Sequence, residues 1–415
     1  MRKFAIVFIF LFSVIIPVST DAQNQEKLDL IVKKINSGSK YLAGVLLDEN
    51  GKSKCEYSII DGVWVDYEPA WHTGQLIYAL SRAHDVTQNS YYLESAQKAA
   101  NWWCNLQITD NPPLNGMLKA IHGDGIEYIV FSTVSDGTAG LFHLYKKTGE
   151  KKYAEIPTEA GKWMYENMYL PEKGLCYDMA DPKTGEIQKK RSAFWPDKEI
   201  QELNDVARPN NEGSLFLDMY KFSQNEKYRE AFINLSNSLV EKQGSEGLWM
   251  DFTPNDKSDN SIHPRFNLWY SESLLDAWDF TGDKKYLEAV LKTAQMYKKL
   301  QQKDGTFFYT NFTDGTPPEK GSVSGSTVAF AGIIYLRLVK AGYAGEFEKN
   351  VEKCFEWLVK NTYAENHPDP NLRGAFVETK VRMSKGKTVV FNRDVGSVFA
   401  VRFLADYYDF LTQKK

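Results

Sequence analysis

Residues 281–300, TGDKKYLEAVLKTAQMYKKL, combine the two features that decide the fold of this chain. The first six residues end one helix at a glycine and start the next at an acidic residue, as in a turn between two helices. The remaining residues place apolar side chains at helical spacing on one side and lysines on the other, so this helix has one face for the core and one for water. The segment therefore predicts a helical hairpin with an outer, water-facing helix.

The same joint returns along the chain, and an aromatic residue follows each copy, where we expect it to pack back on the hairpin. The helix before each joint, as in Ser324–Lys340, is apolar nearly all round, which is typical of a buried helix. The chain therefore alternates inner and outer helices. The copies begin at Asp85, Thr148, Ser223, Thr281 and, less regularly, Ala341.

A second repeat stands between the hairpins: a glycine, then two or three apolar or aromatic residues in strand-like alternation. A helix near Gln25–Tyr41 and a last one at Asp394–Leu411 complete a set of about twelve. We predict an all-α fold, a six-hairpin (α/α) barrel with short β-hairpins at one end, formed by residues 23–415 as a single catalytic domain. The six glycines are Gly62, Gly116, Gly174, Gly247, Gly305 and Gly374.

The N-terminus predicts export. Arg2 and Lys3 precede an apolar stretch, Phe4–Val18, and small residues stand before Gln23 as in a signal-peptide cleavage site. We therefore expect residues 1–22 to be a signal peptide cleaved between Ala22 and Gln23, and the product to be secreted or periplasmic. Outside this stretch no apolar run approaches the length of a membrane span, so no membrane insertion is expected.

Composition narrows the partners of this 415-residue chain. Its 50 basic and 54 acidic side chains give a net charge of −4, which argues against a nucleic-acid binder held by bulk basic charge. The four cysteines are too widely spaced for a zinc finger, and their pairing is left open. No phosphate-binding glycine loop follows a strand, and residues 255–260 match no defined calcium loop, so no cofactor or metal is expected. Oligomeric state is left open.

The connections that lead into the inner helices are long and polar, and a barrel brings them together at one end. There the inner helices present N-termini, whose free N–H groups attract anions. Guanidinium groups suit carboxylates, and aromatic rings suit the apolar faces of sugars, so we expect an acidic poly- or oligosaccharide as ligand. These connections contain His72, His122, His263, Arg191, Arg208, Arg265, Arg393, Trp71, Trp195 and Trp269.

The candidate site residues, and the acidic residues at the helix starts, also have a structural interpretation. Asp136, Glu212 and Asp394 stand at helix starts, where carboxylates are favoured as caps and by the helix dipole. Arg208 and Arg393 could pair with those acids, and the tryptophans could pack in the core. The functional interpretation depends on several loops that carry His, Arg or Trp side chains and meet at one end of the barrel.

The mature chain resembles the six-hairpin glycosidase-like superfamily, which contains polysaccharide lyases, unsaturated glucuronyl hydrolases and acylglucosamine 2-epimerase-like proteins. Trp71-His-Thr-Gly-Gln75, followed by Ala79-Leu-Ser-Arg-Ala83, is similar to a pattern in the C-terminal domain of glucuronyl C5-epimerases. The Phe-Trp-Ser-Gly segment expected of an unsaturated glucuronyl hydrolase is missing. The resemblance implies an enzyme acting on uronate-containing carbohydrate.

Two reactions remain open, and we favour C5 proton abstraction with β-elimination on a uronate. That reaction needs a carboxylate neutraliser and a base or acid, for which Tyr270, His72, His263, Arg265 and Asn210 are the candidates. Glycoside hydrolysis of uronate-containing or unsaturated oligosaccharides needs two carboxyl groups, which Asp136, Glu212, Glu272 and Asp394 could provide. A non-catalytic glycan-binding barrel is a third alternative. Substrate binding is assigned to Trp71, His122, Trp195, Arg208, Trp269, Glu272 and Arg393.

Overall fold

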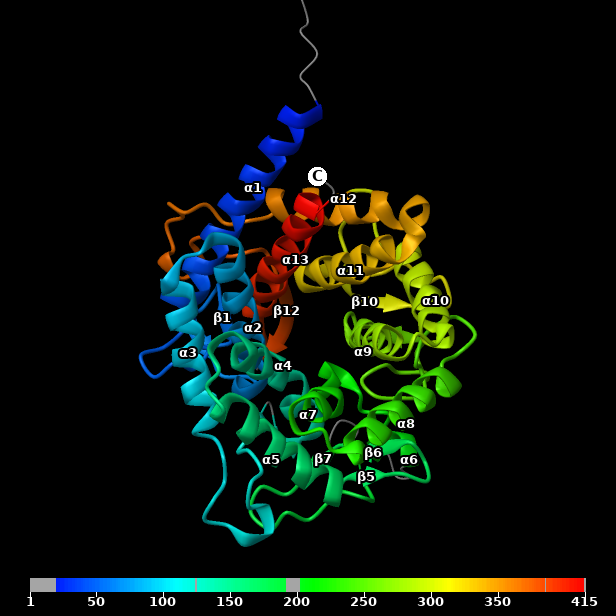
Figure 1. The fold of residues 1–415 in the computed structure, drawn as a ribbon. Coiled ribbons are helices and arrows are strands. Elements are labelled where there is room, and N and C mark those ends of the chain that lie inside the picture. Colours follow the sequence, from blue (N-terminus) through cyan, green and yellow to red (C-terminus); the bar gives the residue numbers. More distant parts are fainter. Residues whose placement is uncertain (1–19, 124, 192–201, 385, 414–415) are drawn as a thin grey trace, which may run out of the picture.

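The computed structural model describes residues 20–413 apart from 124, 192–201 and 385, so most of the predicted signal peptide lies outside the described residues. Within these limits twelve long helices form a closed double ring (Figure 1), and the predicted (α/α) barrel is confirmed. The inner helices are α2 (Pro69–Thr87), α4 (Phe131–Thr148), α7 (Leu215–Ser223), α9 (Phe266–Thr281), α11 (Gly325–Leu338) and α13 (Asp394–Gln413). The outer helices are α1 (Thr20–Tyr41), α3 (Ser90–Cys104), α5 (Lys152–Asn167), α8 (Glu226–Lys242), α10 (Lys284–Leu300) and α12 (Ala344–Lys360).

Burial follows the predicted alternation of inner and outer helices. In α11 every residue except Arg337 is buried, whereas α10 and α12 bury one face and expose the other. Each of the first five inner helices packs against the outer helix that follows it in the chain. The last inner helix, α13, packs instead against α1, the first outer helix, and also contacts α2 and α11, which closes the ring.

The predicted joints end their inner helices in the left-handed conformation. Gly149 and Gly282 do so at φ 75° and 74°, as expected for glycine. At two joints a glutamine, Gln88 or Gln224, takes this conformation instead of the expected glycine. The asparagine that follows each glutamine accepts a backbone hydrogen bond as the N-cap of the next helix.

The repeated glycines turn the chain against a neighbouring outer helix. At Gly305, φ is 94°, and an added Cβ would lie 2.6 Å from the Lys353 carbonyl oxygen of α12. Gly174, Gly247 and Gly374 are pressed in the same way on α8, α10 and α1, whereas Gly116 lies over α5 at an ordinary contact distance of 3.6 Å. The first copy was predicted wrongly, because Gly62 lies in a strand connection and Gly51 is the residue that packs on α3. The local sequence pattern finds the other five glycines, whereas only the approach of the chain to α3 identifies Gly51.

The strands are more extensive than the predicted short hairpins, because strands from distant connections pair in one antiparallel sheet. Its order is β2 (Val63–Val65), β1 (Glu56–Ser58), β13 (Lys387–Arg393), β12 (Thr379–Ser384), β11 (Glu319–Val323), β10 (Phe308–Phe312) and β9 (Ser261–Ile262). Two three-stranded sheets join β3 (Ile121–Gly123), β4 (Ile126–Val130) and β7 (Met179–Ala180), and β5 (Tyr169–Leu170), β6 (Leu175–Tyr177) and β8 (Ala207–Arg208). Short helical turns complete the chain: η1 (Leu42–Leu46), η2 (Pro112–Leu114), α6 (Leu203–Val206), η3 (Glu212–Ser214), η4 (Val339–Tyr343) and η5 (Pro370–Leu372).

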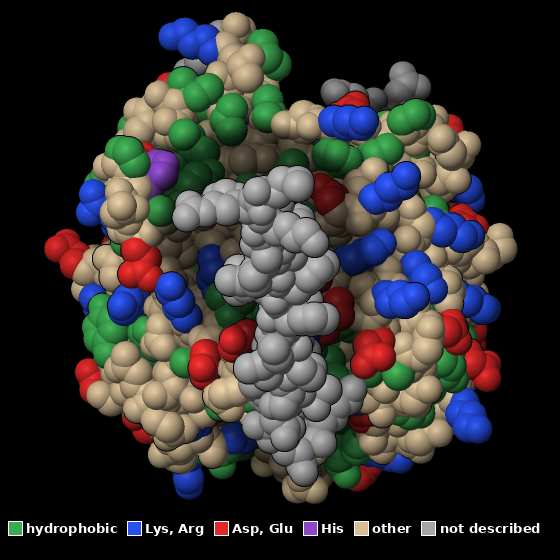
Figure 2. Space-filling view, turned by 90° about the horizontal axis from the view of Figure 1, so that it is seen from above, with side chains coloured by type: hydrophobic (Ala, Val, Ile, Leu, Met, Phe, Trp, Pro, Cys, Tyr) green, Lys and Arg blue, Asp and Glu red, His purple; other side chains and the backbone are tan. Residues whose placement is uncertain are grey.

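Surface charge is mixed on the face shown in Figure 2, where Lys and Arg side chains are interspersed with Asp and Glu. One stretch among the described residues, Gly325–Lys360, is long and apolar enough to cross a membrane by composition. It comprises inner helix α11, the turn η4 and outer helix α12, and 61% of its most apolar window is buried inside the barrel. Core helices of soluble proteins have the same composition, so this stretch is weak evidence for a membrane span.

Replacing Gly305 with alanine should destabilise the barrel more than the same change at Gly282. Both glycines have positive φ, which costs a non-glycine residue roughly 1–2 kcal/mol, but only the Gly305 side chain would also collide with a helix backbone. We expect Gly282→Ala to lower the free energy of unfolding by about 1 kcal/mol and Gly305→Ala by at least twice that. Equal losses in denaturant unfolding would contradict the packing role of Gly305.

Candidate active site

A cavity of about 290 Å³ lies at the end of the barrel where the inner helices begin. Its lining comes from the connections before α2, α4, α7 and α9, from the first residues of α2, α4 and α9, and from the ends of β12 and β13. It therefore occupies the place that the sequence predicts for the site. The residues that line it are Tyr67, Glu68, Trp71, His122, Ile126, Ser132, Thr133, Arg208, Glu212, Pro254, His263, Arg265, Phe266, Trp269, Lys380 and Arg393.

Glu68, at the start of α2, is held as an ionised carboxylate. Its backbone is left-handed, at φ 47° and ψ 53°, a conformation that non-glycine residues rarely adopt and that often marks functional positions. Its carboxylate contacts Nδ1 of His122 and accepts a 2.9 Å hydrogen bond from the Thr133 hydroxyl. Burial alone would raise the pKa of Glu68, but the adjacent His122 outweighs burial and holds the pKa below its usual value.

Glu212, across the cavity, is in the opposite state. It is 2% exposed, and burial, opposed by Arg208 and reinforced by Asp136, raises its pKa from 4.5 to about 8. No described residue hydrogen-bonds its Oε1 atom, and the nearest Arg208 nitrogen is 4.0 Å away. The next residue, Gly213, has φ 70° and would bring a Cβ within 2.6 Å of the Ser135 carbonyl, so the loop is pressed against α4. Glu212 therefore carries a proton at neutral pH.

Asp136 and His72 lie behind the cavity wall. Asp136 accepts a hydrogen bond from the indole of Trp71, and burial raises its pKa to about 7. His72 is fully buried, with Nδ1 2.5 Å from Asp394, whose other oxygen accepts a bond from Ser53. The Nε2 atom of His72 has no hydrogen-bond partner among the described residues. Both residues support Trp71 and the start of α2 from the inside.

Three arginines of the cavity each meet a buried acid on their inner side. Arg208 lies 2.8 Å from Asp178, Arg265 lies 3.4 Å from Glu378, and the Nε of Arg393 donates to Glu56. Arg265 and Arg393 also approach the Tyr309 hydroxyl. These contacts fix the guanidinium groups in place, because a buried charge without a partner is costly.

His263 is neutral, and its tautomer follows from its contacts. Its Nδ1 accepts the backbone N–H groups of Arg265 and Phe266 at the start of α9, so the ring proton is on Nε2. Burial and the neighbouring cations Arg265, Lys380 and Arg393 hold the pKa of His263 well below its usual value. This histidine is a hydrogen-bond donor toward a ligand and a poor proton acceptor.

Comparison with known proteins agrees with this architecture. Residues 13–245, more than half of the chain, match the model of the beta-L-arabinofuranosidase GH127 catalytic domain. The chain belongs to the GH127 catalytic-domain family. It is therefore a member of a carbohydrate-active enzyme family. Comparison with curated proteins finds no match.

Solved structures share the barrel of this GH127 member at low sequence identity, so they establish the fold alone. Cellobiose 2-epimerase from Bacillus thermoamylovorans B4167 is 16% identical, with a TM-score of 0.69 over 92% of this chain and 100% of that one. An unsaturated glucuronyl hydrolase specific for heparin is 11% identical, with a TM-score of 0.65 over 93% and 98%. A polysaccharide lyase is 16% identical, with a TM-score of 0.57 over 94% and 98%. The predicted resemblance to the six-hairpin superfamily is confirmed.

The structure brings together most of the predicted site residues of this GH127 member. Trp195 lies outside the described residues, and Arg191, at their edge, is exposed. The predicted residues that line the cavity are His263, Arg265, Glu212, Trp71, His122, Arg208, Trp269 and Arg393.

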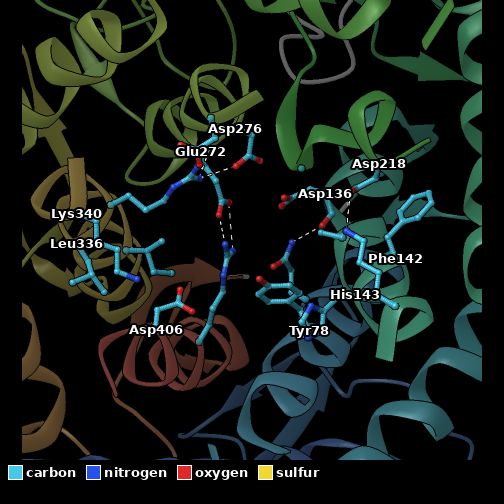
Figure 3. A pocket seen from close by; sticks show the side chains of 18 residues that line it. Tyr78, Asp136, Phe142, His143, Asp218, Glu272, Asp276, Leu336, Lys340 and Asp406 are labelled. Atoms are coloured by element: carbon cyan, nitrogen blue, oxygen red, sulfur yellow. Dashed lines mark hydrogen bonds and ion pairs between the residues drawn. The ribbon is translucent and has the colours of Figure 1, made fainter. Parts of the chain in front are cut away.

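Five predicted residues do not line this cavity: His72 and Asp136, which lie behind its wall, and Asn210, Tyr270 and Glu272. Asn210 is buried and donates to Asp178, behind Arg208. Tyr270 is fully buried between Trp249 and Phe266, with no hydrogen-bond partner for its hydroxyl among the described residues. Glu272 lines a second cavity of about 460 Å³ farther along the barrel axis, where it pairs with Arg402 (Figure 3). The assignment of Glu272 to this substrate site was wrong, because it stands two turns of α9 below Arg265.

Sequence reasoning missed Tyr67, Glu68 and Lys380 among the residues that line the cavity. Tyr67 and Glu68 stand in the connection before α2, in which Trp71 and His72 were the predicted site residues. Lys380 is one lysine of an ordinary alternating strand and gives no local signal. Its position depends on the sheet that joins β12 to β13.

The cysteines and acidic groups provide no metal centre within the described part of the chain. Cys55, Cys104, Cys176 and Cys354 are all free and buried, in four different elements or loops. No group of three His, Cys, Asp or Glu side chains among the described residues could hold a metal ion. In the loop considered for calcium, Asp256 and Asp259 bond their own turn.

Glu212 should make the stability of the protein depend on pH. Its folded-state pKa is about 8 and its ordinary value 4.5, so between these values the folded chain holds a proton that the unfolded chain has lost. Stability contributed by this group therefore falls as pH rises through that window. Glu212→Gln should raise the melting temperature relative to the native protein by an amount that grows from pH 4.5 to pH 8. Exposed Glu94→Gln is the control, and a pH-independent difference for Glu212→Gln would contradict the assignment.

Tyr270→Phe should leave catalysis intact. The hydroxyl is buried, unpaired and outside the cavity, so its removal should keep or slightly raise the melting temperature, because a buried unpaired polar group is destabilising. Turnover and thermal melting measure the two effects. Loss of turnover with an unchanged fold would return Tyr270 to the reaction.

Proposed function

We propose that this protein is an exported glycoside hydrolase that cleaves a glycosidic bond beside a uronate sugar. Family membership supports glycoside chemistry, and the Arg2, Lys3 and Phe4–Val18 pattern supports export. The observation that carries the proposal is the pair Glu68 and Glu212, two carboxyl groups in one cavity whose surroundings drive their pKa values apart. Such divergence separates the acid from the base in glycoside hydrolysis.

The roles follow from the protonation states. Glu212, protonated at neutral pH, donates its proton to the leaving oxygen. Glu68, ionised and held by His122 and Thr133, stabilises positive charge at the sugar ring and accepts the proton of the attacking water. Trp71 and Trp269, whose rings lie 5.7 Å apart edge to face, provide apolar walls for the sugar. The side chains that suit a carboxylate are Arg208, Arg265, Arg393, His263 and Lys380.

C5 proton abstraction with β-elimination is the second candidate, and one observation favours it. Arg265, Arg393 and His263 line the same cavity, and elimination requires that the uronate carboxylate be neutralised before the C5 proton leaves. In this mechanism Tyr67, which lines the cavity beside Arg393, takes the role predicted for Tyr270. A glycan-binding barrel without catalysis would bind the same ligands and release no product.

A panel of acidic polysaccharides, unsaturated uronate oligosaccharides and a neutral β-L-arabinofuranoside distinguishes these alternatives. Hydrolysis releases reducing ends without a new chromophore and removes the ultraviolet absorbance of an unsaturated substrate. Elimination raises that absorbance because it creates a conjugated double bond. Cleavage of the neutral arabinofuranoside alone would contradict the uronate proposal and leave hydrolysis intact.

Glu212→Gln should reduce kcat by roughly 10²- to 10⁴-fold with little change in substrate affinity, since it removes the acid and keeps the shape. Asp218→Asn is the matched control, because Asp218 is another acid whose pKa burial raises, to about 6, but it lines the second cavity. Turnover of both variants is measured by reducing ends. Full activity in Glu212→Gln would overturn the proposed acid.

A further inference from the structure

The arginines of the active-site cavity are already balanced by the protein. Arg208, Arg265 and Arg393 each contact a buried carboxylate that does not line the cavity, namely Asp178, Glu378 and Glu56. Their charges stabilise the wall whether or not a ligand is present. Discrimination between a charged and a neutral sugar therefore needs a group without such a partner.

Lys380 is such a group. It lies on β12 opposite Phe391 of β13, is half-buried and lines the cavity. Its amine forms no ion pair with a carboxylate of the described residues and lies 5.6 Å from the centre of the Tyr309 ring. Glu56, the acid that partly offsets the cationic surroundings of Lys380, is bound to Arg393 and lies 3.5 Å from Arg382. Glu378, two residues before Lys380, is likewise bonded to Tyr309 and Ser326, so an anion in the cavity that Lys380 lines can supply its counter-charge.

The surroundings of Lys380 are cationic on several sides. Burial, followed by repulsion from Arg393 and Arg382, lowers the pKa of Lys380 to about 7, and Glu56 opposes this only in part. The amine is therefore partly uncharged at neutral pH, and an anion beside it would restore the charge. The titratable and charged groups around it are Arg382 from β12, Glu378 just before β12, Arg393 from β13, Arg265 and His263 at the start of α9, Tyr309 from β10, and Glu56 from β1.

We propose that Lys380 selects an anionic sugar by forming an ion pair with the substrate carboxylate, and that it takes up one proton from solvent when that carboxylate binds. This inference rests on the proposed function, because it places a uronate in the cavity. Lys380 lies outside residues 13–245, the part matched by the GH127 model, so the family match does not itself assign a role to this lysine. The bond formed is non-covalent, and the proton moves from buffer to the lysine amine.

Binding calorimetry with free D-glucuronate, and with glucose as its uncharged counterpart, tests this coupling without catalysis. Repeating the titration in buffers of different ionisation enthalpy gives the number of protons taken up. At a pH above the Lys380 pKa of about 7 we expect uptake approaching one proton per glucuronate. Well below that pH the amine is already charged, so we expect no uptake.

Two variants of Lys380 separate the effect of its charge from the effect of its titration, and a variant of Lys387 serves as the control. Lys380→Met should weaken glucuronate binding by about 10- to 100-fold, abolish proton uptake and leave glucose binding unchanged. Lys380→Arg should retain glucuronate binding without proton uptake, because arginine stays charged. Lys387→Met, an exposed lysine of β13 on the same hairpin, is the control and should behave as the native protein. Melting temperatures confirm that each variant is folded.

The outcomes separate this inference from the proposed function. Proton uptake that persists in Lys380→Met, equal losses for glucuronate and glucose, or no glucuronate binding by the native protein would each overturn the role of Lys380. Failure to cleave any member of the glycan panel, with the proton linkage intact, would overturn the proposed hydrolysis alone. Cleavage of uronate glycans without the linkage would leave the hydrolase and remove Lys380 as its charge sensor.

Discussion

The contacts between the two ends of the chain are the constraint on which the site depends. Inner helix α13 packs against α1 and α2, and β13 pairs with β1 so that Arg393 stands opposite Glu56. One residue later Asp394 bonds His72 and Ser53. These contacts join residues more than 300 positions apart. Without them the starts of α2 and α13 would not face the start of α9, and no single cavity would exist.

The electrostatics of the cavity follow from its depth. Burial makes an unpaired charge costly, so each arginine is matched by an acid and Glu68 by His122. Where no such match exists, the group gives up its charge. Glu212 retains its proton, and Lys380 readily loses one. The proposed catalytic acid and the proposed sensor for a substrate charge both arise from incomplete pairing, and both line the same cavity.

The barrel lumen is divided along its axis. The cavity at the start of the inner helices holds the tryptophans and cations, whereas the larger cavity farther along holds Glu272, Arg402 and several aspartates (Figure 3). Asp136 stands at the division, bonded to Trp71 above and lining the larger cavity below. Side chains of one inner helix thus line different cavities according to their position along the barrel axis.

The sequence by itself determined the ring of hairpins. Helical periodicity and left-handed turns are local properties, so the inner and outer helices and most repeat glycines can be recognised from neighbouring residues. It also located the decorated connections, because loops before inner helices must meet at one end. Only the tertiary structure decided that Gly51 rather than Gly62 packs on α3, and that distant strands join in one sheet.

Tertiary structure also decided which side chains reach the cavity. Arg265 and Glu272 are seven residues apart on one helix, yet a rise of about 1.5 Å per residue places them in different cavities. Lys380 enters the site through strand pairing, and Glu212 is protonated because of neighbours contributed by other helices. The position of a side chain along the barrel axis and the charge of the groups around it depend on segments that are distant in sequence. No local sequence pattern therefore predicts them.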